Sequence, residues 1–324
     1  MSERKAKVGM ISPDLIDPNP ENPRLIFDEK QDLILLESID EVGILVPLIV
    51  YPTGRDRYTL LDGERRLRCA KRLNLKEVPV NIIAAPDRIE NILRMFNIHN
   101  IREQWKLMPT ALKMRTILED ERFKNKSKRE IGKLTGLTAS TVDRCIELID
   151  LDKKYQDMIL EYYLLGEPAD FKFSEDFFLE MNRALNSIKK FQRELYDKYT
   201  RTGLTDRFVE KRKQNVIKDV IDFRKINEII GTTKLGAADE TVKDTLRKLI
   251  DETGFSIEEA YKQVAEPVIK AKTIEDLCRK LIEQLEMNLE NIPNFSKRED
   301  FSKLLEMVNE TVKKSLSKIR TKKA

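Results

Sequence analysis

Apolar residues in the first hundred positions show both strand and helix spacing. Three short runs, dense in apolar and β-branched residues, predict strands at 45–51, 58–61 and 78–83. A turn over 53–57 joins the first two of these runs, and helical spacing begins just after the second. A further helix is expected over 31–42, with an apolar stripe of Leu33, Leu36, Ile39 and Val42. The pattern predicts a small mixed α/β domain over residues 1–100.

Beyond about residue 87 the spacing of apolar residues is almost wholly helical. Helices are expected over 89–118 with a break near Pro109, and again over 175–230. Residues 232–238 suggest a linker, and Ser256 and Thr273 suggest two further helix starts. The helix from 274 to 289 carries one stripe formed by Ile274, Leu277, Leu281 and Leu285. The fold class is therefore α+β, a mixed domain followed by helices.

Four parts are expected along the chain. They are the mixed domain at 1–100, a helical DNA-binding domain at 101–170, a helical extension at 171–232 and a helical C-terminal region at 233–324. This last part ends in a tail with six Lys/Arg and no acid from Lys313 onward. The tail either grips nucleic acid or is a solubilising end. The apolar stripe of the helix from 274 to 289 requires a partner helix, either within the chain or on a second subunit.

Composition narrows the kinds of chemistry that are possible. The 324 residues are 36% charged, with 11 Gly and 12 Pro, and the net charge is only +4. No membrane span or signal peptide is predicted, so we expect a cytoplasmic protein without a membrane partner. Cys69, Cys145 and Cys278 are far apart, which argues against a zinc site or a disulfide framework. His99 is the only histidine, so a multi-histidine metal site is excluded.

The segment Leu61–Arg68 is the first candidate site. Gly63 lies between a predicted strand and a predicted helix, where a tight turn can require positive φ. The helix start then offers backbone N–H groups and the positive end of its dipole. Arg65, Arg66 and Arg68 add three permanent charges there. The segment suits a polyphosphate or a nucleic-acid phosphate, although such arginines also line ordinary solvated helix faces.

Residues 127–149 form the second candidate site, a helix-turn-helix. Ser127 and Glu130 match a capping box, Gly136 suits the turn, and Thr138 can cap the second helix. Ile131 and Leu134 are expected to face inward. DNA contacts are expected from Lys128, Arg129, Thr138, Ser140, Thr141 and Arg144. The alternative is an ordinary helical hairpin.

An ordered series of short motifs connects these two segments. It runs through 19–24, 38–43, 47–50, 63–68, 78–80 and 100–103 to the helix-turn-helix. In this order the motifs resemble the ParB family of partition proteins, whose N-terminal domain has a ParB/sulfiredoxin-like fold. The resemblance covers roughly residues 8–150.

The resemblance implies a DNA clamp that binds CTP with Mg²⁺, reads a DNA site through the helix-turn-helix and dimerises at its C-terminal end. It also implies double-stranded DNA and a partition ATPase as partners, with the protein associated with the nucleoid or a plasmid. Nucleotide contacts carried over to this chain are Arg24, Gly63, Glu64, Arg65, Arg66, Arg68, Asn100 and Arg102. Segment 43–47 matches the part near the nucleobase.

One position departs from the family pattern. His99 stands where the family usually has an acid that helps to hold the metal, and imidazole is a poor Mg²⁺ ligand. The metal candidates are therefore Glu64, Asn100 and Glu103, and weak CTP hydrolysis stays open. Three hypotheses follow: a CTP-dependent DNA clamp, a DNA-binding regulator without hydrolysis, and a ParB-like nuclease or NTPase. The third needs clustered carboxylates, and only Asp62, Glu64 and Glu103 lie near the glycine motif.

Overall fold

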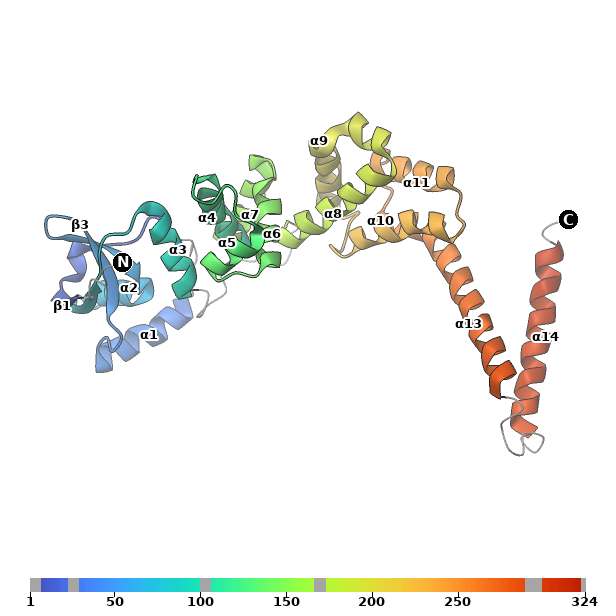
Figure 1. Ribbon diagram of the computed structural model, residues 1–324, viewed down its shortest axis with the longest axis horizontal. Coiled ribbons are helices and arrows are strands. Elements are labelled where there is room, and N and C mark those ends of the chain that lie inside the picture. The colour runs from blue at the N-terminus through green and yellow to red at the C-terminus, as the bar shows by residue number, and fades with distance from the viewer. Residues whose placement is uncertain (1–6, 23–28, 100–105, 166–172, 289–298, 322–324) are drawn as a thin grey trace. The chain divides into compact units, whose positions relative to one another are not determined.

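A five-stranded mixed sheet organises the first part of the chain (Figure 1). The structure is a computed structural model that describes residues 7–22, 29–99, 106–165, 173–288 and 299–321. The strand order is β1-β5-β3-β4-β2, with β3 and β4 as an antiparallel hairpin and β5 parallel to β3. The strands are β1 Lys7–Ile11, β2 Ile16–Asp17, β3 Leu48–Gly54, β4 Arg57–Asp62 and β5 Val78–Ile82.

The two faces of the sheet belong to different apolar clusters. Leu48, Val50 and Leu60 point to one face, where Leu67 and Ala70 of α2 (Glu64–Arg72) join them. The next residues along the same strands, Tyr51 and Leu61, point to the other face and contact Met95 of α3 (Arg88–His99). This alternation follows the two-residue repeat of a strand. The sheet thus fixes the position of α2, which carries the first candidate site.

The mixed domain differs from the prediction in β1 and β2, which were not anticipated, and in two further details. The strand predicted over 45–51 is β3 and begins only at Leu48, since Leu45 and Val46 are exposed and lie outside the sheet. The helix α1 (Glu29–Val42) is present, but its predicted stripe is only partly covered, since Leu33 and Val42 are exposed while Ile39 is buried. Spacing alone could not show which apolar residues have neighbours to pack against.

Two of the next four helices after α3 form the predicted helix-turn-helix over residues 127–149. The four helices are α4 Leu107–Glu119, α5 Lys128–Thr135, α6 Ala139–Ile149 and α7 Lys153–Leu165. The two helices predicted over 89–118 are α3 and α4, and Pro109 is the third residue of α4, where its missing N–H has no intrahelical partner to lose. Leu134 was wrongly expected inside and is exposed, whereas Ile131 is buried. A Cβ atom on Gly132 would lie 2.6 Å from the carbonyl oxygen of Leu137, so the backbone of α5 packs directly against the backbone of the turn.

An aromatic cluster holds the next three helices together. These helices are α8 Glu175–Phe191, α9 Arg193–Lys213 and α10 Asp222–Gly231. Phe177 packs edge-on against Phe178 and Phe223, and Phe223 contacts Phe208, with ring centroids between 5.1 and 5.4 Å apart. Burial of such rings dominates the energetics of a small helical core.

A lysine is enclosed at the end of α9. The side chain of Lys211 is 1% exposed, and its ammonium donates to the carbonyl oxygens of Phe255 at 2.8 Å, Thr253 at 3.1 Å and Glu252. A buried ammonium requires such partners, because its loss of hydration is otherwise unfavourable. Lys211 therefore holds segment 252–255 against α9.

The last third is helical, with two departures from prediction. Its elements are η2 Thr232–Leu235, α11 Asp239–Asp251, α12 Ile257–Ala260, η3 Tyr261–Ala265, α13 Glu266–Asn288 and α14 Glu299–Thr321. The predicted linker is instead the short helix η2, with Thr232 buried. Thr273 starts no helix: it lies inside α13, and its hydroxyl donates to the carbonyl of Ile269. The chain forms two compact units, residues 1–227 with 250–257, and 228–249 with 258–324.

Candidate functional sites

The turn between β4 and α2 has the conformation that the sequence predicts. Gly63 adopts φ +110° and precedes the first residue of α2, Glu64. A Cβ atom on Gly63 would lie 3.1 Å from Leu48 Cγ and 3.2 Å from Arg66 Nη2. Both the backbone angle and the close neighbours therefore favour glycine. The turn leaves the N–H groups of the first helical turn without partners in their own helix.

Arg66 ties this turn to the segment before β3. Its Nη1 donates to the carbonyl oxygen of Pro47 at 2.9 Å and to that of Val46, and its Nη2 lies 3.0 Å from an Asp62 carboxylate oxygen. The Arg66 side chain is only 15% exposed. These contacts fix segment 46–47, which the resemblance places near the nucleobase. Arg66 thus shapes the site and does not extend into solvent.

The other two arginines of the motif are also held by carboxylates. Arg65 Nε donates to an oxygen of Asp32 in α1 at 2.6 Å, and Arg68 Nε donates to Glu64 Oε1 at 3.0 Å. The pairing of Arg65 with α1 could not be read from the motif, because Asp32 lies far away in sequence. Neutralising contacts of this kind keep several guanidinium groups close together.

Glu64 has a buried oxygen without a hydrogen-bond partner. Its Oε1 accepts from Arg68, whereas its Oε2 is buried and has no hydrogen-bond partner among the described residues. A buried carboxylate oxygen of this kind is unfavourable unless a cation or a donor from a ligand meets it.

Cys69, further along α2, is buried, and burial raises the pKa of its thiol, so the thiol stays protonated.

The second half of the predicted nucleotide site lies outside the described residues. This applies to Arg24, Asn100, Arg102 and Glu103, and to the side chain of His99, whose backbone ends α3. Their roles remain predictions. Within the described ranges, no group of three or more His, Cys, Asp or Glu residues is placed to hold a metal ion.

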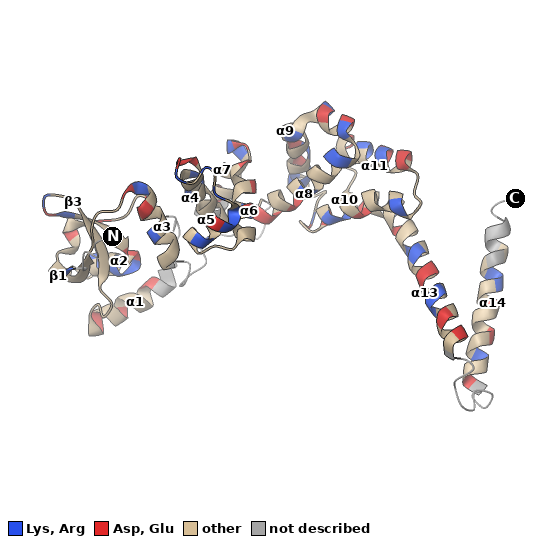
Figure 2. Ribbon diagram, viewed as in Figure 1, with Lys and Arg blue, Asp and Glu red and all other residues tan. Residues whose placement is uncertain are grey.

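The helix-turn-helix has both of its predicted caps. Ser127 and Glu130 form the capping box at the start of α5, and Gly136 ends that helix with φ +73°. The Thr138 hydroxyl accepts from the N–H of Thr141 at 3.1 Å and so caps α6. Lys128, Arg129, Thr138 and Ser140 are exposed, and Thr141 and Arg144 are half-buried. Figure 2 colours blue the lysines and the arginine of α5 and the single arginine of α6.

Two of the predicted DNA-contacting cations are paired within the protein. The ammonium of Lys128 contacts the carboxylate of Asp143 in α6. Arg144 Nη2 lies 2.8 Å from Asp176 Oδ1, at the start of α8. The sequence analysis did not identify Asp176, because only the packing of α8 on α6 brings it to this position.

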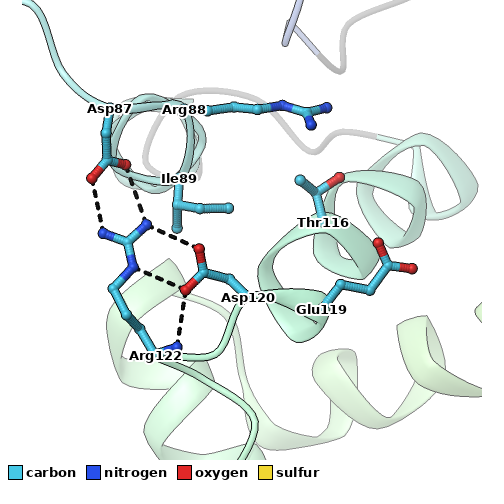
Figure 3. A pocket seen from close by; sticks show the side chains of 7 residues that line it. All are labelled: Asp87, Arg88, Ile89, Thr116, Glu119, Asp120 and Arg122. Atoms are coloured by element: carbon cyan, nitrogen blue, oxygen red, sulfur yellow. Dashed lines mark hydrogen bonds and ion pairs between the residues drawn. The ribbon is translucent and has the colours of Figure 1, made fainter.

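A hollow of about 460 Å³, not anticipated from the sequence, lies where the start of α3 meets the end of α4 (Figure 3). Arg122 bridges its two sides: Nη1 is 2.8 Å from an oxygen of Asp87, and Nε is 2.9 Å from one of Asp120. The hydrogen bonds from Arg122 lower the pKa of Asp87 to about 2. Nearby, Glu21 accepts from Arg88 and Lys113, each at 2.7 Å. These charges join the mixed domain to the helical domain.

The fold and the two sites define a class of protein in which a mixed domain with a glycine-led turn precedes a helix-turn-helix. Residues 1–101 match the family profile of the ParB N-terminal domain. The chain is 35% identical over 137 residues to the chromosome-partitioning protein Spo0J of Thermus thermophilus, covering 42% of this chain and 48% of that protein. It is 31% identical over 161 residues to a probable chromosome-partitioning protein ParB of Helicobacter pylori, covering 49% and 53%. The chain thus spans about half the length of these curated relatives.

Solved ParB structures are also similar to this chain. The C-terminally truncated ParB from Caulobacter crescentus complexed with CTP-gamma-S is 26% identical, covers 49% of this chain and 87% of that one, and gives a TM-score of 0.28. A pNOB8-like ParB N-domain is 19% identical, with 86% of this chain and 98% of that one covered, and gives a TM-score of 0.40.

In the described residues, no helix is both long and apolar enough to cross a membrane.

Proposed function

We propose that this protein is a CTP-dependent DNA clamp that serves plasmid or chromosome partition. The observation that carries the proposal is the presence, in one chain, of the Gly63 turn at the start of α2 and the capped helix-turn-helix. The first offers amides and guanidinium groups to a polyphosphate, and the second suits a DNA groove. The choice of cytidine triphosphate follows from the family resemblance.

In this proposal the start of α2 binds the triphosphate. The N–H groups after Gly63 and the guanidinium groups of Arg65 and Arg68 contact phosphate oxygens, and Arg66 holds the adjoining segment in place. Arg24, Asn100 and Arg102 complete the nucleotide contacts. Mg²⁺, when bound, neutralises phosphate charge. Glu64 suits this ion, because Mg²⁺ prefers oxygen ligands and the Oε2 atom of Glu64 has no hydrogen-bond partner among the described residues. Asn100 and Glu103 are the further candidates.

The helix-turn-helix binds double-stranded DNA in the same proposal. Thr138, Ser140 and Thr141 lie at the start of α6, where small hydroxyl side chains permit close approach to the duplex. Lys128 and Arg129 in α5 contact phosphates beside the groove, and Arg144 contacts DNA from the second turn of α6. Binding of this kind places the protein on a nucleoid or plasmid, where a partition ATPase is the further partner.

The C-terminal helices are proposed to form a homodimer. Ile274, Leu277 and Leu281 along α13 are exposed, as are Leu304 and Met307 on α14. Basic and acidic residues recur along α13 (Figure 2). Apolar stripes of this kind are unfavourable in water and are typically covered by another helix.

Calorimetric titration of each nucleoside triphosphate, with and without the DNA site selected by the protein, tests the proposal. We expect the natural protein to bind CTP and none of the other three nucleotides. The variant Arg68→Ala should bind CTP on the order of tenfold more weakly, because it loses a charge-assisted contact with the triphosphate. Arg72→Ala removes the same charge from the far end of α2 and is the matched control. Equal binding of all four nucleotides would contradict the proposed switch.

The alternative function is a DNA-binding regulator with the same fold and no hydrolysis. His99, in place of the usual acid, favours it. A phosphate-release assay of the natural protein beside His99→Glu separates the two. Release by both proteins supports a hydrolysing clamp, whereas release by His99→Glu alone supports the regulator.

A further inference from the structure

Arg144, on the predicted DNA-reading helix, already has an anionic partner inside the protein. Its Nη2 lies 2.8 Å from Asp176 Oδ1, and the two side chains are 38% and 65% exposed. The contact joins α6 to α8 across 32 positions of sequence. A DNA phosphate approaching Arg144 therefore meets a carboxylate that binds the same guanidinium group.

Asp176 lies in the first turn of α8. It is the second residue of α8, in a first turn capped by the Ser174 hydroxyl, and a carboxylate there is stabilised by the helix dipole. Next along α6, Glu147 accepts from Asn182 of α8 at 3.0 Å. Arg144 and Glu147 are three residues apart and share one side of α6. Two successive contacts thus align α8 with that side of the helix.

We propose that Asp176 is a specificity-determining residue for DNA binding. It competes with phosphates for Arg144, so that random DNA gains little from this cation. A cognate site can offer Arg144 a two-pronged contact with a guanine edge, which a single phosphate oxygen does not match. Asp176 therefore weakens non-cognate complexes more than cognate ones. This inference rests on the proposed function, namely that the helix-turn-helix binds duplex DNA.

The variant Asp176→Asn tests the inference in the full-length chain. Fluorescence anisotropy with a random-sequence duplex and with the selected site, each over a range of salt, gives both affinities and both salt slopes. We expect random-duplex affinity to rise about two- to fivefold, the range that an exposed ion pair supports. The slope of log K against log salt should steepen by about 0.9, the value for one added phosphate contact. The ratio of cognate to random affinity should fall.

The matched control is Asp197→Asn in α9. Asp197 is 58% exposed and is paired with Arg193 one turn away, so the variant loses the same charge far from α6 in sequence and in contacts. A second control is Asp176→Asn in an Arg144→Ala background, where the gain should vanish if the two side chains are directly coupled. Melting temperatures show that each variant is folded.

Three results would overturn the inference. The first is an equal effect of Asp176→Asn and Asp197→Asn, and the second is a gain that persists without Arg144. The third is an equal rise in cognate and random affinity, because Asp176 would then act as a general charge. If the natural protein binds no duplex, the proposed function fails before any variant is compared, so the two failures are distinguishable.

Discussion

Replacing Lys211 by methionine tests whether the enclosed ammonium holds α9 to segment 252–255. Methionine keeps most of the apolar stem but removes the donor that three backbone carbonyls share. Leaving a buried acceptor unpaired costs about 1–3 kcal/mol, so three acceptors set an upper limit near 9 kcal/mol. The loss is smaller because the variant no longer has to desolvate a charge and because the carbonyls can turn to water. We expect the free energy of unfolding to fall by about 3 kcal/mol.

Urea unfolding followed by far-ultraviolet circular dichroism measures this loss as a lower midpoint at unchanged slope. Lys213→Met is the control, since Lys213 is exposed two residues further along and should change stability by less than about 0.5 kcal/mol. If the two variants unfold at the same urea concentration, the carbonyl contacts of Lys211 do not stabilise the fold, and the argument from its burial is wrong.

Three further expectations concern other parts of the chain. The pKa of Asp87 lies near 2, below the usual value of about 4, so its ion pair with Arg122 stabilises the fold above pH ~4 and is lost as the pH falls toward 2. An NMR titration of the Asp87 carboxyl checks this, and Arg122→Gln should return its pKa toward 4. Gly63→Ala should lower stability by about 1–3 kcal/mol because of its φ of +110°. Gly54→Ala should not, because its φ is ordinary and its new Cβ atom would make only a van der Waals contact, 3.8 Å from Arg57 Cβ. Thermal melts of both variants test this. Leu277→Asp should turn a dimer into a monomer by light scattering, and a variant of unchanged mass would show that α13 is not the interface.

Features set by neighbouring residues could be predicted from the sequence. The turn at Gly63 and the cap at Thr138 depend on backbone angles and on hydroxyl groups within three residues of the helix start, and both are confirmed. The same local rule failed at Thr273, because a hydroxyl inside a helix can bond to the preceding turn instead of capping a new one. Capping signals show where a helix can begin but do not show that it begins there.

Features that depend on distant packing could not be predicted. Arg66 was identified as a phosphate-binding candidate, but its contacts with the carbonyls of Val46 and Pro47 require the assembled sheet. Asp32 and Asp176 carry no motif of their own, and each reaches an arginine only because its helix packs beside another. The sequence therefore identified where the candidate sites lie, whereas the carboxylates that balance their charges came from the structure.

The contact at Gly132 bears on any attempt to retarget this protein. Because even a methyl group there would collide with the Leu137 carbonyl, the spacing between α5 and α6 is set by the absence of a side chain. Exposed positions of α6 such as Ser140 can be exchanged to recognise a new sequence, while a change at Gly132 would tilt the whole helix and misalign every base contact at once. Libraries for altered specificity should vary the former and keep the latter constant.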